Sequence, residues 1–117
     1  MKLDTFTRQY LTTALWSSTD GPDDTPMDRD YSIEDFSDEA LAQAVEDCAR
    51  FQAEHADDTG AHDGRAGHDF WLTRNGHGAG FWDGDWPEAV GERLTDAAHA
   101  FGETSPYVGD DGRIYFQ

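Results

Sequence analysis

An excess of carboxylates is the feature that most limits how this chain can fold. Its 117 residues include 25 Asp and Glu but only 8 Lys and Arg, which gives a formal net charge of -17. Hydrophobic residues make up 37% and aromatic residues 13%, so large rings must fill a core that has few aliphatic side chains. Roughly two-thirds of the surface can be buried at this length. We therefore expect residues 1–117 to form a single folded domain, with Trp16, Trp71, Phe81, Trp82 and Trp86 as candidate core rings.

The same charge limits the classes of partner. Binding of DNA, RNA or an anionic membrane requires cationic side chains that neutralise phosphates. We therefore expect no direct nucleic-acid contact and no membrane contact, whereas basic protein surfaces are attracted. Asp outnumbers Glu by 18 to 7 and Arg outnumbers Lys by 7 to 1, as in the products of GC-rich genes. Two explanations of the negative charge stay open. It reflects the general amino-acid composition of the source organism, or it creates an electrostatic field that attracts a basic partner.

Cysteine use and hydropathy indicate a cytoplasmic protein. Cys48 is the one cysteine, which excludes an internal disulfide and a multi-cysteine zinc site. The segment MKLDTFTRQYLTTALW lacks the sustained apolar run of a secretory signal. No stretch approaches the roughly 18 apolar residues of a membrane span.

Apolar residues at helical spacing predict three helices. Asp4 is a suitable N-cap for a helix over 5–16, and Ser37 for a second helix that reaches about His55. Pro87 suits the first position of a third helix over 87–101.

Two segments have the character of hairpins. Residues 68–74 are rich in strand formers, Asn75-Gly76 is a turn signal, and 79–82 can return as the partner strand. Residues 106–108 and 113–116 form a second pair around a glycine-rich turn. The resulting prediction is an α+β fold of order ααββαββ, with an antiparallel sheet of two hairpins packed by three helices.

Histidine and aspartate gather in the middle of the chain. Imidazole and carboxylate are suitable ligands for divalent metals. The candidates are His55, His62, His68, His77, Asp57, Asp58, Asp63, Asp69 and Asp83. Their spacing matches no metal motif, so we predict no metal and no cofactor. A small-ligand or metal site in this segment and the glycine-rich hairpin stays open as the alternative function.

The same segment offers one candidate catalytic arrangement. His68 next to Asp69, with His77 across the predicted hairpin, would be half of an acid–base device. No nucleophile accompanies the pair, and residues 74–80 lack the glycine order and the Lys of a nucleotide-binding loop. We therefore expect a non-enzymatic protein without catalytic residues.

The densest acidic run begins in residues 17–30, which we expect to form an exposed loop because of their Gly, Pro and Asp content. Carboxylates in a row can imitate the phosphates of a DNA strand and occupy a basic groove. The predicted partner-binding residues are Asp23, Asp24, Asp28, Asp30, Glu34, Asp35, Asp38 and Glu39. A solvated acidic loop is the simpler alternative, and exposed aromatic residues leave a homodimer open.

The segment GHDFWLTRNGHGAGFWDG at 67–84, with GDDGRIY at 109–115, resembles a family of small acidic proteins encoded by bacteriophages and mobile elements. The resemblance covers about the last half of the chain and implies a role in the cytoplasm of an infected bacterium. Small acidic phage proteins often inhibit host enzymes or host defence systems. The resemblance therefore implies a protein that binds and modulates a host protein with a basic surface, such as a defence or nucleic-acid-binding protein.

Overall fold

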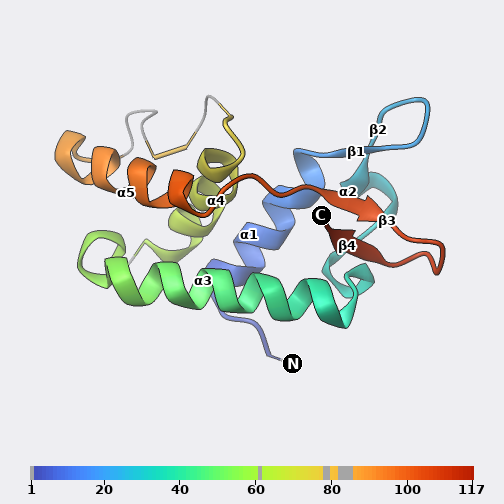
Figure 1. Ribbon diagram of the computed structural model, residues 1–117, viewed down its shortest axis with the longest axis horizontal. Helices are drawn as coiled ribbons and strands as arrows, with labels where there is room; N and C mark the ends of the chain where they lie inside the picture. The colour runs from blue at the N-terminus through green and yellow to red at the C-terminus, as the bar shows by residue number, and fades with distance from the viewer. Residues whose placement is uncertain (1, 61, 78–79, 82–85) are drawn as a thin grey trace.

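The chain combines helices with two small antiparallel sheets, as the α+β prediction required (Figure 1). The structure is a computed structural model and describes residues 2–60, 62–77, 80–81 and 86–117. The elements, in chain order, are α1 (Thr5–Trp16), β1 (Thr19–Asp20), β2 (Thr25–Pro26), α2 (Met27–Asp30), the 3-10 helix η1 (Ile33–Asp35), α3 (Asp38–Thr59), α4 (Asp63–Arg74), α5 (Glu88–Ala100), β3 (Pro106–Val108) and β4 (Ile114–Phe116).

Two predicted helix caps are confirmed. The Asp4 carboxylate accepts the Thr7 amide at 2.8 Å, and the Ser37 hydroxyl accepts the Ala40 amide at 3.0 Å. Each bond satisfies a backbone N–H that a helix start leaves unpaired. α3 runs a turn beyond its predicted end, with a kink at His55, and Gly60 follows it at a φ of 49°.

The predicted strand over 68–74 is wrong, because these residues belong to α4. Phe70, Trp71 and Leu72 are consecutive and all buried, so α4 is covered on several sides. A helix enclosed in this way has no amphipathic period, and its apolar run cannot be distinguished from that of a buried strand. Gly80 and Phe81 form no strand, while 78–79 and 82–85, including Trp82 and Asp83, lie outside the described residues.

The sheets also correct the predicted order. Residues 17–30 are not a loop throughout, because β1 pairs antiparallel with β2 and α2 follows. β3 pairs with β4 as predicted, with Tyr107 opposite Tyr115. The two hairpins form separate two-stranded sheets, so the order ααββαββ and the single sheet under three helices are wrong. The Ser37 amide donates to the Ile114 carbonyl at 2.8 Å and ties the start of α3 to β4.

Aromatic rings dominate the core, as the composition predicts. Phe51 of α3 stacks on Phe70 of α4 at 4.3 Å between ring centroids and on Phe81 at 5.6 Å. Trp16 does not join this core and is 45% exposed. None of the described helices is both long and apolar enough to cross a membrane.

A charged side chain lies inside this core. Arg74 at the end of α4 donates to the Asp47 carboxylate of α3 at 2.8 Å and to the Tyr10 hydroxyl of α1 at 2.9 Å. It also donates to the carbonyl oxygens of Phe101 at 3.1 Å and Gly102 at 2.8 Å, where α5 ends. Burial raises the pKa of Tyr10, although the Arg74 charge opposes the shift. This network joins four helices, so we assign it to stability.

Candidate functional site

The predicted partner-binding carboxylates gather at one end of the molecule. Asp23 and Asp24 lie in the turn between β1 and β2, Asp28 and Asp30 in α2, Glu34 and Asp35 in η1, and Asp38 and Glu39 in the first turn of α3. Figure 1 shows β1, β2, α2 and the start of α3 beside β3 and β4, on the side away from α5. All these residues are exposed except Asp35, which is partly buried. We call segments 17–39 and 106–117 the acidic end.

One basic side chain at the acidic end, Arg113, is engaged in the fold. Arg113 donates to the carbonyl oxygens of Glu34 and Phe36, both at 3.1 Å, and holds η1 against β4. Arg29 of α2 is the other basic residue of these segments. Asp35 has a structural role as well, because its carboxylate accepts the Ser32 amide at 2.8 Å.

The β3–β4 turn adds carboxylates that the sequence prediction missed. Asp110 and Asp111 are exposed in this turn. The Tyr115 hydroxyl donates to Asp111 at 2.5 Å, and with the Arg113 amide it lowers the pKa of that carboxyl. The sequence contains the pair Asp110 and Asp111, but only the fold shows that these residues lie at the acidic end.

A cavity of about 550 Å³ opens at the acidic end between α1, α2 and η1. Leu15, Tyr31 and Ile33 give it an apolar wall, and Asp28 and Glu34 place carboxylates on its rim. Arg8, Thr12 and Ser32 complete the lining. An apolar stem with a cationic head, as in Lys or Arg, matches this combination.

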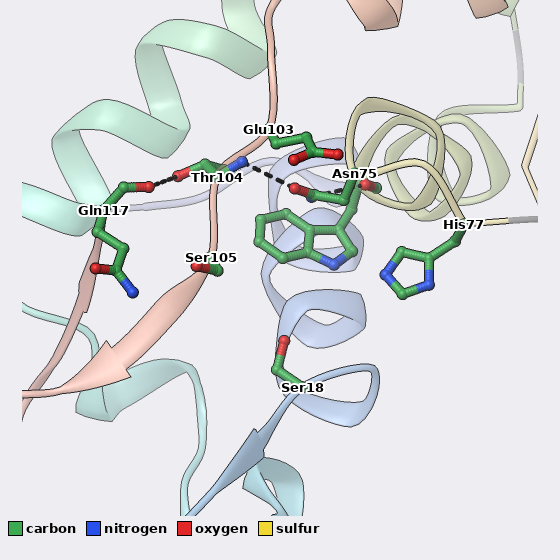
Figure 2. Close-up of a pocket in the computed structure, with 8 residues that line it drawn as sticks. Ser18, Asn75, His77, Glu103, Thr104, Ser105 and Gln117 are labelled. Atoms are coloured by element: carbon green, nitrogen blue, oxygen red, sulfur yellow. Dashed lines mark hydrogen bonds between the residues drawn. The ribbon is translucent and has the colours of Figure 1, made fainter.

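A second, more polar cavity of about 300 Å³ lies where the end of α4 meets the segment that leads into β3. Figure 2 shows His77, Glu103, Ser105 and Ser18 around the cavity, which Trp71 also lines. These side chains come from separate segments of the chain, so their spacing in the sequence gives no sign of the cavity. Of the predicted site residues, only His77 lies here.

Hydrogen bonds connect the segments that line the polar cavity. Asn75 accepts the Thr104 amide at 2.8 Å and donates to the Trp71 carbonyl at 3.0 Å, and Thr104 donates to the Gln117 carbonyl at 3.0 Å (Figure 2). Within the described part of the chain, the side chains of Ser18, His77, Glu103 and Ser105 show no protein hydrogen bond. Donors and acceptors are thus left for a small polar ligand.

The predicted His68–Asp69 pair forms, but without His77. The His68 ring lies 2.8 Å from Oδ1 of Asp69 and stacks on Trp16 at 5.7 Å between centroids. Asp69 is 1% exposed, and its other oxygen accepts the Trp86 indole N–H at 2.7 Å. The pair lies on α4, whereas His77 lines the polar cavity.

The remaining His and Asp candidates are dispersed. His55 lies at the kink of α3 against Phe51, His62 precedes α4 and contacts Trp86, and Asp58 pairs with Arg93. Among the residues that the structure describes, no three His, Cys, Asp or Glu side chains are grouped so that they could hold a metal ion.

Comparison with family models, with curated proteins and with solved structures gives no match.

Proposed function

We propose that the chain is a non-enzymatic binding protein that occupies the basic surface of a bacterial host protein and modulates or inhibits it. The acidic end is the binding surface in this proposal. The partner is a defence or nucleic-acid-binding protein whose groove ordinarily meets phosphates, so the carboxylates act in place of a nucleic-acid strand.

One observation supports this function most. Carboxylates from β1–β2, α2, η1, α3 and β3–β4 are presented together, although they span most of the chain length. A charge distribution of this kind raises the rate of encounter with a basic surface and selects against acidic partners. The cavity between α1, α2 and η1 adds a place for one basic side chain of the partner.

The experiment is capture of partners from a bacterial lysate at moderate salt, followed by binding measurements on the purified partner. The double variant Asp28→Lys/Glu34→Lys reverses two charges at the cavity rim. We expect it to weaken binding by at least about tenfold and to reduce the dependence of the affinity on salt.

The matched control is Glu54→Lys/Asp57→Lys, which reverses two exposed charges at the other end of α3. We expect it to change the affinity by less than about threefold. An equal loss with both variants would show that net charge alone drives binding, and the acidic end would then not be the site. Competition by duplex DNA for the same partner separates occupation of a nucleic-acid groove from binding elsewhere.

The polar cavity supports a second candidate function, the binding of a small polar ligand. Its support is the group of side chains in Figure 2 that have no protein partner among the described residues. A thermal-shift panel of sugars, nucleosides and amino acids tests it, because a ligand that binds only the native state raises the melting temperature. The shift should disappear in His77→Ala or Glu103→Ala and persist in Asp57→Ala.

A further inference from the structure

A third cavity, of about 570 Å³, lies along α5 and is separate from the acidic end and from the polar cavity. Phe81, Trp86 and Gly91 form one part of its wall. A Cβ at Gly91 would lie 2.5 Å from the Phe81 carbonyl oxygen, so glycine allows α5 to approach this wall. The volume is typical of a small-ligand site.

Three carboxylates border the cavity along α5. Glu88, Glu92 and Asp96 follow one another at four-residue intervals, and all three line it. Residues four apart lie on one helix face, separated by a rise of about 6 Å. The lining has no Lys, Arg or His among the described residues. Negative charge is therefore spread in a row instead of converging on one point, as a metal ion would require.

Thr95, which also lines the cavity, carries a buried hydroxyl that has no partner among the described residues. Thr95 is 5% exposed, and its Oγ1 has no hydrogen bond within the described structure. Two other buried helical threonines bond to the carbonyl four residues earlier, Thr13 at 2.7 Å and Thr59 at 3.2 Å. An unpaired buried hydroxyl is unfavourable. A ligand with N–H donors would satisfy it.

The aromatic wall suits a cation with an apolar body. The Trp86 indole is fixed by its hydrogen bond to Asp69 at 2.7 Å and by an edge contact with Phe81 at 5.5 Å between centroids. Indole faces attract cations, and aromatic rings cover methylene groups.

From this combination we infer that the α5 cavity binds a linear aliphatic polyamine. Its amino groups pair with the row of carboxylates, one ammonium donates to the Thr95 hydroxyl oxygen, and the methylenes lie against Trp86 and Phe81. Short polyamines space their charges over a distance comparable to one helical turn, which is the spacing of the row. The inference is independent of the proposed function at the acidic end.

Isothermal titration calorimetry with spermidine in 150 mM NaCl tests the inference, with NMR detection of the Trp86 indole N–H. We expect saturable binding that shifts this resonance. Glu88→Gln/Glu92→Gln should weaken the affinity by about tenfold, since each exposed charge pair contributes modestly. Asp28→Asn/Glu34→Gln removes the same charge at the acidic end and should change the affinity by less than about twofold. Equal losses in the two variants, or no saturation, would overturn the inference.

Thr95→Val provides the second arm, because it keeps the shape of the side chain and removes the hydroxyl. The free protein should be as stable as the parent or more stable, since an unpaired buried hydroxyl is lost. Spermidine affinity should nevertheless fall severalfold, whereas an unchanged affinity would contradict the assigned contact. The substitutions at Glu88, Glu92 and Thr95 lie outside the acidic end, so failure here leaves binding of the basic partner intact.

Discussion

Arg74 and Asp47 form a buried ion pair, with Nη1 of the guanidinium 2.8 Å from Oδ2 of the carboxylate. The two side chains are 5% and 11% exposed. The same guanidinium also donates hydrogen bonds to the Tyr10 hydroxyl and to the carbonyl oxygens at the end of α5. A charge in this position is tolerated because nearly every donor has a partner.

We expect Arg74→Leu to lower the free energy of unfolding by about 3–5 kcal/mol, because it leaves Asp47 buried without its counter-charge. Urea denaturation followed by circular dichroism measures the change. Arg29→Leu, at an exposed position, is the control and should stay within about 0.5 kcal/mol of the parent. A similar small effect at Arg74 would show that the pair contributes little.

Gly67 sets the distance between α4 and α1. A Cβ at this position would overlap the carbonyl oxygen of Phe6, so Gly67→Ala should force the helices apart and destabilise the protein by about 1–3 kcal/mol. Gly64 on the same helix has its nearest neighbours, in Gln9 and Thr5, at 3.7 and 3.8 Å. Gly64→Ala should therefore stabilise by about 0.5–1 kcal/mol, since alanine is the better helix former. The two melting temperatures, measured together, must move in opposite directions.

The hydrogen bond from Trp86 to the buried Asp69 makes a further prediction. Trp86→Phe keeps a ring but removes the N–H that donates to a carboxylate that is 1% exposed. Loss of this buried hydrogen bond should cost about 1–3 kcal/mol in unfolding free energy. The same substitution at Trp16, which is 45% exposed, should change the stability by less than about 0.5 kcal/mol. Equal effects would contradict the assigned role of the bond.

Acid titration should reveal the Asp58–Arg93 pair, which joins the end of α3 to α5. The hydrogen bond from Arg93 lowers the pKa of Asp58 below its ordinary value of 3.8. A lowered pKa in the folded state means that the ionised carboxylate stabilises the protein above pH 3.8, and that this contribution is lost as the pH falls through the folded-state value.

Asp58→Asn should therefore be slightly less stable than the parent at pH 7, and the difference should vanish below the folded-state pKa. The difference should also shrink in high salt, because Arg93 is 56% exposed. Urea midpoints of both proteins between pH 2.5 and 7 provide the comparison, and a difference that grows toward low pH would contradict the prediction.

Local signals placed several elements correctly. The Asp4 and Ser37 caps with apolar residues at helical spacing predicted α1 and the start of α3, and the glycine-rich turn near Gly112 predicted the β3–β4 hairpin. These features depend on neighbours in the chain, so a single sequence contains them. The strand prediction for His68–Arg74 failed because it depends on contacts with distant parts of the chain. Phe70, Trp71 and Leu72 are buried among helices, and this packing outweighs their preference for strands.

For the candidate sites, too, some features follow from the sequence and others only from the tertiary structure. Composition by itself determined that the surface is strongly acidic and the core aromatic, because net charge and ring content do not depend on the path of the chain. Tertiary structure alone decided that carboxylates from distant segments share one end, that His77 lies near Glu103 and away from His68, and that Arg74 pairs with Asp47. The shared end and the two contacts join residues far apart in the sequence, and only the packing of the helices and the two hairpins brings them within reach.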